Sequence, residues 1–154
     1  MNATQLTGIV AFGVAALLCF RVRWGQIGAI NAVFAIECVF GLRHRIHDLA
    51  VQLMGPLYAE RGGVQIVLIG LALALLAGSG ILLLLSKHRL VPANVTAATL
   101  LAVALFSIEV ISLHAIDAVL YRYVGDVMVI GWLWLALALV IAIGALRAKS
   151  RKGG

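Results

Sequence analysis

Two stretches of the sequence combine acidic and histidine side chains with a strongly apolar background. The first is "FAIECVFGLRHRIHD" and the second is "FSIEVISLHAID". In each stretch a glutamate is followed within a few turns by histidine and aspartate, which are residue types able to bind metal ions or move protons. The candidate residues are Glu37, His44, His47, Asp48, Glu109, His114 and Asp117.

These residue types predict a transition-metal site. A charged group inside a bilayer is costly, so Glu37 should be protonated, paired or bound to a metal. Imidazole and carboxylate together suit iron, copper, zinc or manganese. Helix bundles often hold such metals with Glu-x2-His motifs, whereas the spacings here are Glu-x6-His-x2-His and Glu-x4-His-x2-Asp. The similarity is therefore one of ligand type, and it predicts metal binding with redox or oxygen-activating chemistry.

Helical geometry tests whether each set can converge. If the first stretch is one continuous helix, His44 and Asp48 lie within about 20° of the direction of Glu37, because each residue advances the helix by 100°. His47 then points about 80° away. On the second stretch, Asp117 lies about 80° and His114 about 140° from Glu109. Two facing helices could bring both sets together.

Other readings of the same residues stay open. Arg43 and Arg45 could pair with Glu109 and Asp117, so that the cluster only fastens the helices of an accessory subunit. The glutamates could instead form a proton or cation pathway, since histidine titrates near neutral pH. An acid–base enzyme acting on a lipid-like substrate is a third alternative, and haem held by His44 and His114 is a fourth.

The composition identifies the class of protein. The chain has 154 residues, of which 64% are hydrophobic and 12% charged, whereas soluble domains carry roughly 25% charged residues. We therefore expect an all-α integral membrane protein with a single transmembrane domain over 1–154. The net charge of +6 does not indicate nucleic-acid binding, because the basic residues flank apolar segments and form no continuous patch.

Five apolar segments are long enough to cross a bilayer, which takes roughly 20 residues. Glycine, proline and charged residues separate them, as expected for turns. The predicted structure is a bundle of five transmembrane helices, at about 4–21, 25–54, 64–86, 92–121 and 126–147.

The basic residues predict the orientation of this bundle. By the positive-inside rule the face richer in Lys and Arg is cytoplasmic. One face receives Arg21, Arg23, Lys87, Arg89, Arg147, Lys149, Arg151 and Lys152, and the other receives Arg43, Arg45, Arg61 and Arg122. We expect a bacterial inner-membrane protein with its N-terminus outside, its C-terminus in the cytoplasm, and all its acidic residues in the outer half or on the outer face.

The two stretches also resemble each other. "FAIE" at 34–37 matches "FSIE" at 106–109, and "HRIH" at 44–47 resembles "HAID" at 114–117. Helices 2 and 3 could therefore correspond to helices 4 and 5 as a parallel repeat, with a site at the repeat interface. Because little of the chain lies outside the bilayer, we expect a homo-oligomer or a subunit of a larger membrane complex. A hydrophobic small molecule is the expected ligand type.

Overall fold

A computed structural model describes residues 1–41, 91–111 and 114–150, together with Arg45, Asp48, Leu49, Gln52, Leu76 and Gly78. Nearly all of these residues are helical. The predicted third segment, about 64–86, lies outside the described residues except for Leu76 and Gly78, which are both helical. The all-α prediction is thus confirmed for the described part of the chain.

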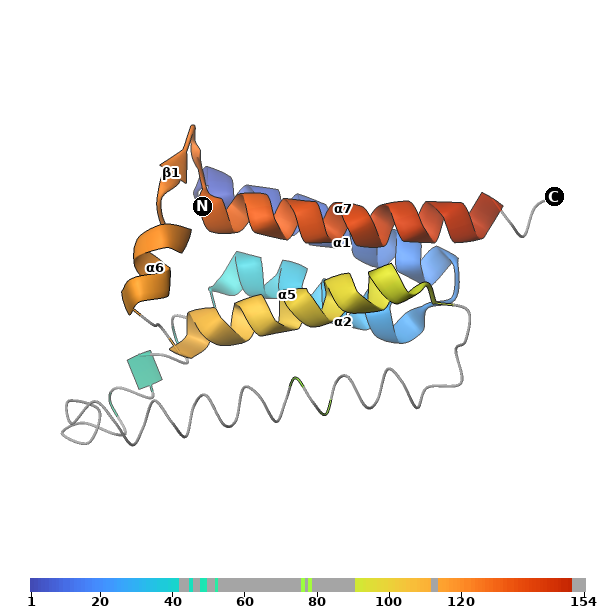
Figure 1. Cartoon of the computed structure of the whole chain (residues 1–154), viewed down its shortest axis with the longest axis horizontal. Coiled ribbons are helices and arrows are strands. Elements are labelled where there is room, and N and C mark those ends of the chain that lie inside the picture. Colours follow the sequence, from blue (N-terminus) through green and yellow to red (C-terminus); the bar gives the residue numbers. More distant parts are fainter. Residues whose placement is uncertain are drawn as a thin grey trace.

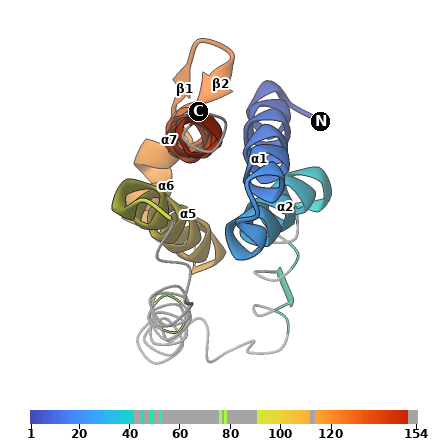
Figure 2. The same cartoon turned by 90° about the vertical axis from the view of Figure 1, so that its right-hand side faces the viewer.

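Within the described residues, four long helices form a bundle (Figure 1): α1 (Ala3–Arg21), α2 (Gly25–Phe40), α5 (Ala93–Ile111) and α7 (Val129–Ser150). Helices α1 and α7 run in one direction, and α2 and α5 run in the other. Viewed from the end of the bundle, the four helices surround a common centre (Figure 2).

The ends of α1 are fixed by local hydrogen bonds. At its start, the Asn2 side chain accepts a bond from the Gln5 backbone N–H at 2.8 Å, and the Gln5 side chain accepts one from the Asn2 N–H at 3.0 Å, which is a capping box. At its end, the N–H groups of Trp24 and Arg23 donate to the carbonyls of Cys19 and Phe20. This Schellman motif places Arg23 at a φ of 66°. The chain therefore turns back directly into α2.

The core residues recur every three or four positions along each helix. This spacing is that of a left-handed coiled coil, in which side chains of one helix fit between those of its neighbours. The buried residues with this spacing include Thr4, Gly8, Phe12, Ala15 and Cys19 on α1, Ile27, Asn31, Phe34 and Cys38 on α2, Val95, Thr99, Ala102, Phe106 and Glu109 on α5, and Gly131, Trp134, Ala138, Ile141 and Ala145 on α7, with Glu37 buried beside Cys38.

Two of the predicted helices are shorter than expected. The prediction of one helix over 25–54 is wrong, because α2 ends at Phe40 and Gly41 adopts a left-handed conformation with φ 60° and ψ 39°. Its N–H closes the helix on the carbonyl of Glu37 at 2.7 Å. The predicted helix over 92–121 is likewise not one straight helix, because α5 is described as far as Ile111 and the short α6 (His114–Leu120) runs in another direction (Figure 1). The angles projected from Glu37 and Glu109 past these points therefore do not apply.

A small hairpin joins α6 to α7. Strands β1 (Tyr123–Val124) and β2 (Val127–Met128) pair in antiparallel fashion. The turn between them begins with Gly125 at a φ of 67°, a conformation that glycine adopts without steric cost. The backbone N–H of Met128 donates to the hydroxyl of Thr4 at 2.9 Å, which fastens the hairpin to the first turn of α1.

The outward faces of α1 and α7 are apolar. Helix α1 exposes Leu6, Val10, Val14 and Leu17 along one side, and α7 exposes further large apolar residues, including Leu139. Both helices are long and apolar enough to cross a membrane. Polar side chains lie inside the bundle instead, and the buried ones are Thr4, Asn31, Glu37, Thr99 and Glu109.

Candidate functional site

Four aromatic rings, one from each long helix, meet in the middle of the bundle. Phe34 of α2 and Phe106 of α5 are stacked, with ring centroids 4.3 Å apart and planes 8° from parallel. Trp134 of α7 stacks on the ring of Phe106 at 5.3 Å, and Phe12 of α1 lies 5.3 Å from Phe34 and 5.7 Å from Phe106. We call these four side chains the aromatic layer.

The stacked phenylalanines fix the register between α2 and α5. These two helices run in the same direction (Figure 1). Glu37 follows Phe34 by three residues and Glu109 follows Phe106 by three, so each glutamate lies about one turn beyond the aromatic layer. The register therefore brings the two glutamates to the same level of the bundle, on the same side of the layer.

Both glutamates are buried, with 8% of Glu37 and 4% of Glu109 exposed. A carboxylate away from water is stable only when it is paired, protonated or bound to a metal. In agreement with this requirement, each of the two residues has an interaction partner. The repeat noticed in the sequence thus corresponds to two buried glutamates in equivalent places, each one turn after a phenylalanine of the same stack.

The backbone makes this level of the bundle more negative. Glu37 lies in the last turn of α2, which is closed by Gly41 after Phe40, and Glu109 lies in the last described turn of α5. The C-terminal end of a helix carries about half a negative charge, which favours cations there and disfavours anions. Within the described helices, the last turns of α2 and α5 contain no lysine or arginine. The partners of Glu37 and Glu109 are therefore not lysine or arginine side chains from the last turns of these two helices.

The remaining predicted ligands have different positions. Asp48 is exposed, in contrast to Glu37. Asp117 is half-buried on α6 and has an interaction partner. His114 begins α6, five residues after Glu109. His44 and His47 lie outside the described residues.

Helix α6 runs from the end of α5 toward the hairpin and α7 (Figures 1 and 2). His114, at the start of α6, follows Glu109 by five residues, and Asp117 lies about one turn further along α6. Among the described residues, no group of three or more His, Cys, Asp and Glu side chains is close enough to hold a metal ion.

Two fully buried polar residues were not singled out from the sequence. The amide nitrogen of Asn31 donates to the carbonyl of Ile27 at 2.8 Å, and the hydroxyl of Thr99 donates to the carbonyl of Val95 at 2.9 Å. Both precede the aromatic layer, whereas the glutamates follow it. Asn31 lies three residues before Phe34 and Thr99 seven before Phe106, and this helical spacing was the signal that could have identified them as core positions.

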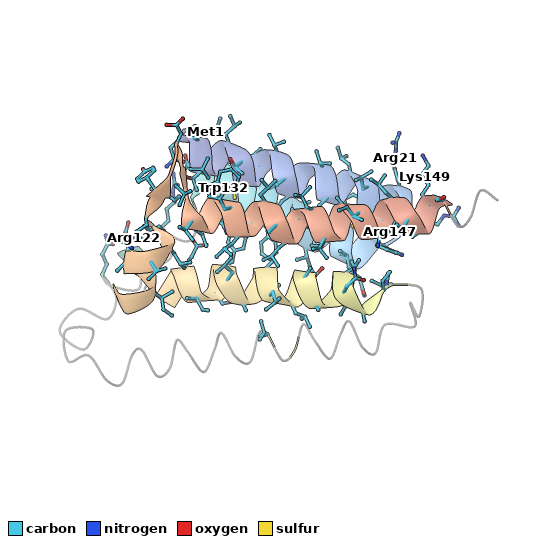
Figure 3. All side chains as sticks on the ribbon, turned by 45° about the horizontal axis from the view of Figure 1, so that its top comes forward. Met1, Arg21, Arg122, Trp132, Arg147 and Lys149 are labelled. Carbon is cyan, nitrogen blue, oxygen red and sulfur yellow. The ribbon has the colours of Figure 1, made fainter. Side chains whose placement is uncertain are left out.

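Charged side chains mark the two ends of the bundle (Figure 3). Arg21, Arg147 and Lys149 lie at one end, and Met1 and Arg122 lie at the other. Helices α2 and α5 point toward the end with Met1 and Arg122. We call this the Arg122 end, and the opposite one the Arg147 end; the glutamates lie in the half of the bundle nearer the Arg122 end.

The chain matches no protein-family model, no curated protein and no solved structure.

Proposed function

We propose that the chain is an integral protein of the bacterial inner membrane, folded as one bundle of five transmembrane helices with its N-terminus outside and its C-terminus in the cytoplasm. The apolar outward faces of α1 and α7 support insertion into lipid. The cluster of Arg21, Arg147 and Lys149 at one end supports the orientation, because basic residues collect on the cytoplasmic side. Helices 2 and 3 would then correspond to helices 4 and 5 as a parallel repeat.

The function proposed for this bundle is to bind a metal cation at Glu37 and Glu109, on the side of the aromatic layer nearer the Arg122 end. The observation that carries the proposal is the stacking of Phe34 on Phe106, which sets both buried glutamates at one level. The partial negative charge at the C-terminal ends of α2 and α5 would favour a cation at this level.

Histidines near the two glutamates would complete the ligand set. His114 follows Glu109 at the start of α6, and His44 and His47 follow Glu37 in the sequence. Imidazole and carboxylate ligands suit iron, copper, zinc or manganese. Asp117 and Asp48 are further carboxylates that could bind the metal directly or hold a ligating histidine.

Redox chemistry is the reaction class proposed for this site. Iron or copper would supply electron transfer or oxygen activation, and a substrate dissolved in the outer leaflet could reach the site from the membrane. The protein would then be a small membrane oxidoreductase, working as a homo-oligomer or as a subunit of a larger membrane complex.

Elemental analysis tests the proposal directly. The protein is purified without chelators into nanodiscs, and metal per chain is measured for the wild type, Glu37→Gln and Glu109→Gln. Asp126→Asn serves as a matched control, since Asp126 is exposed in the hairpin turn and loses the same charge. We expect stoichiometric metal in the wild type and the control, and loss of metal in both glutamine variants, because a site that lacks one ligand binds much more weakly.

Absence of metal from the wild type, or equal metal in all four proteins, would contradict the proposal. Arg43 and Arg45 would then be the source of compensating charge, and the cluster would fasten helices together. A separate test with reporter fusions at Arg61 and at the C-terminus examines the five-helix topology, which requires the two reporters to lie on opposite sides of the membrane.

A further inference from the structure

The aromatic layer separates two polar regions of the bundle. On one side lie the buried carboxyl groups of Glu37 and Glu109. On the other side Asn31 precedes Phe34 by about one turn and Thr99 precedes Phe106 by about two turns. Asn31 and Thr99 are fully buried, and the side-chain oxygen of Asn31 has no hydrogen-bond partner among the described residues.

The rings between these polar groups are closely packed. Neighbouring centroids lie 4.3 to 5.7 Å apart. Phe12 and Trp134 are fully buried, and 8% of Phe34 and 7% of Phe106 are exposed. A continuous apolar cross-section gives water and ions no polar group to replace their hydration, and such constrictions close pores by excluding water.

The packing beside the layer leaves little room for rearrangement. A Cβ atom added at Gly8 of α1 would come within 2.6 Å of the Cys38 sulfur and 2.9 Å of the Trp134 ring. Beyond the layer toward the Arg147 end, small residues such as Ala138 and Ala145 are buried on α7, and small residues let helices approach closely. The rings are therefore held in place from several sides.

We infer that the aromatic layer closes the interior of the bundle, so that the glutamate level is reached from the Arg122 end only and no ion passes through to Asn31. This inference rests on the membrane insertion proposed above and assigns the side from which the proposed cation enters. It distinguishes a binding site with one entrance from a proton or cation pathway. Glu37 lies in the last turn of α2, and Glu109 lies two residues before Ile111, the last described residue of α5.

Cysteine accessibility tests this inference in proteoliposomes of defined orientation. Glu109→Cys and Asn31→Cys are treated from each side with a cationic, membrane-impermeant methanethiosulfonate reagent, and labelling is measured by mass spectrometry. The wild type is the blank, because Cys19 and Cys38 are fully buried. We expect Glu109→Cys to react from the Arg122 side only, and Asn31→Cys not to react from that side.

Three results would overturn the inference: labelling of Asn31→Cys from the Arg122 side, labelling of Glu109→Cys from the Arg147 side, or no labelling of Glu109→Cys from either side. Phe34→Ala is then added to the Asn31→Cys chain. Removing this ring should make the new cysteine reactive from the Arg122 side. If the folded double variant remains unlabelled, residues other than Phe34 close the bundle. If the double variant does not fold, the labelling of Asn31→Cys and Glu109→Cys still tests the inference.

The labelling experiment does not depend on bound metal. It is carried out on protein with and without prior chelation. If the wild type contains no metal but shows the expected labelling, the metal-binding proposal is wrong and the closed aromatic layer is supported. If the protein binds metal at the glutamates but Asn31→Cys is labelled from the Arg122 side, metal binding is supported and the closed layer is wrong.

Discussion

Adding a single methyl group at Gly8 should destabilise the bundle beside the aromatic layer. The Cβ of Gly8→Ala would lie 2.6 Å from the Cys38 sulfur and 2.9 Å from a carbon of the Trp134 ring. The indole cannot move aside easily, because it is fully buried and stacked on Phe106 with planes 2° from parallel. The strain must therefore be taken up by a shift of α1 away from its neighbours.

Gly13 of the same helix provides a matched control. A Cβ added there meets nothing within 4 Å. Replacing a helical glycine by alanine stabilises a helix by roughly 0.5–1 kcal/mol, and this gain applies at both positions. The difference between the two variants thus isolates the cost of overpacking, which is typically about 1–3 kcal/mol.

The assay is the thermal unfolding midpoint in one detergent, measured by circular dichroism. For a chain of this size, about 1 kcal/mol corresponds to roughly 2–4 °C. We expect Gly8→Ala to melt about 2–12 °C below Gly13→Ala. Equal midpoints, or a Gly8→Ala protein as stable as Gly13→Ala, would refute the close contact of α1 with Cys38 and Trp134.

Two further substitutions test other parts of the fold. Thr4→Val removes the acceptor of the part-buried Met128 N–H, and leaving that group unsatisfied should cost about 1 kcal/mol, the lower end of the range for buried groups. Thr7→Val, whose hydroxyl bonds only within its own helix at Ala3, should cost clearly less, and equal losses in chemical denaturation would count against the anchored hairpin. Arg23→Gly should raise the unfolding midpoint, because a residue with a side chain at a φ of 66° carries a strain of roughly 1–2 kcal/mol that glycine avoids; a lower midpoint would show that the arginine side chain contributes more than this strain.

Much of the helical framework could be predicted from the sequence. Apolar length alone identified α1 and α7, which were expected over about 4–21 and 126–147 and are observed at Ala3–Arg21 and Val129–Ser150. The gap between the predicted segments 92–121 and 126–147 corresponds to the hairpin and its Gly125 turn. These features depend on composition and turn residues, which act locally.

The end of α2 was harder to predict. The residue types after Gly41 are compatible with a helix, so the sequence pattern predicted a continuous helix. Gly41 is instead a C-cap of the common left-handed type. This misplacement changed the predicted direction of every side chain after Gly41, including Asp48, which was expected on the stripe of Glu37 and is exposed.

The aromatic layer shows a different limit of the sequence. Phe34 and Phe106 belong to the repeat that drew attention to Glu37 and Glu109, yet nothing in the sequence says that their rings stack. That contact depends on the parallel arrangement of α2 and α5. Packing between segments that are far apart in the chain determines this arrangement. Phe12 joins the same layer from α1, which lies outside the repeat, and Trp134 joins it from α7.

The most direct test of the central claim, that Glu37 and Glu109 hold a cation together, is the effect of a chelator on stability. A metal that binds the folded state at 100 times its dissociation constant adds about 2.7 kcal/mol of stability. We predict that chelation lowers the unfolding midpoint of the wild type and of Asp126→Asn, and leaves the midpoints of Glu37→Gln, Glu109→Gln and the double variant unchanged. A chelator shift of the same size in all five proteins, or in none of them, would contradict the claim.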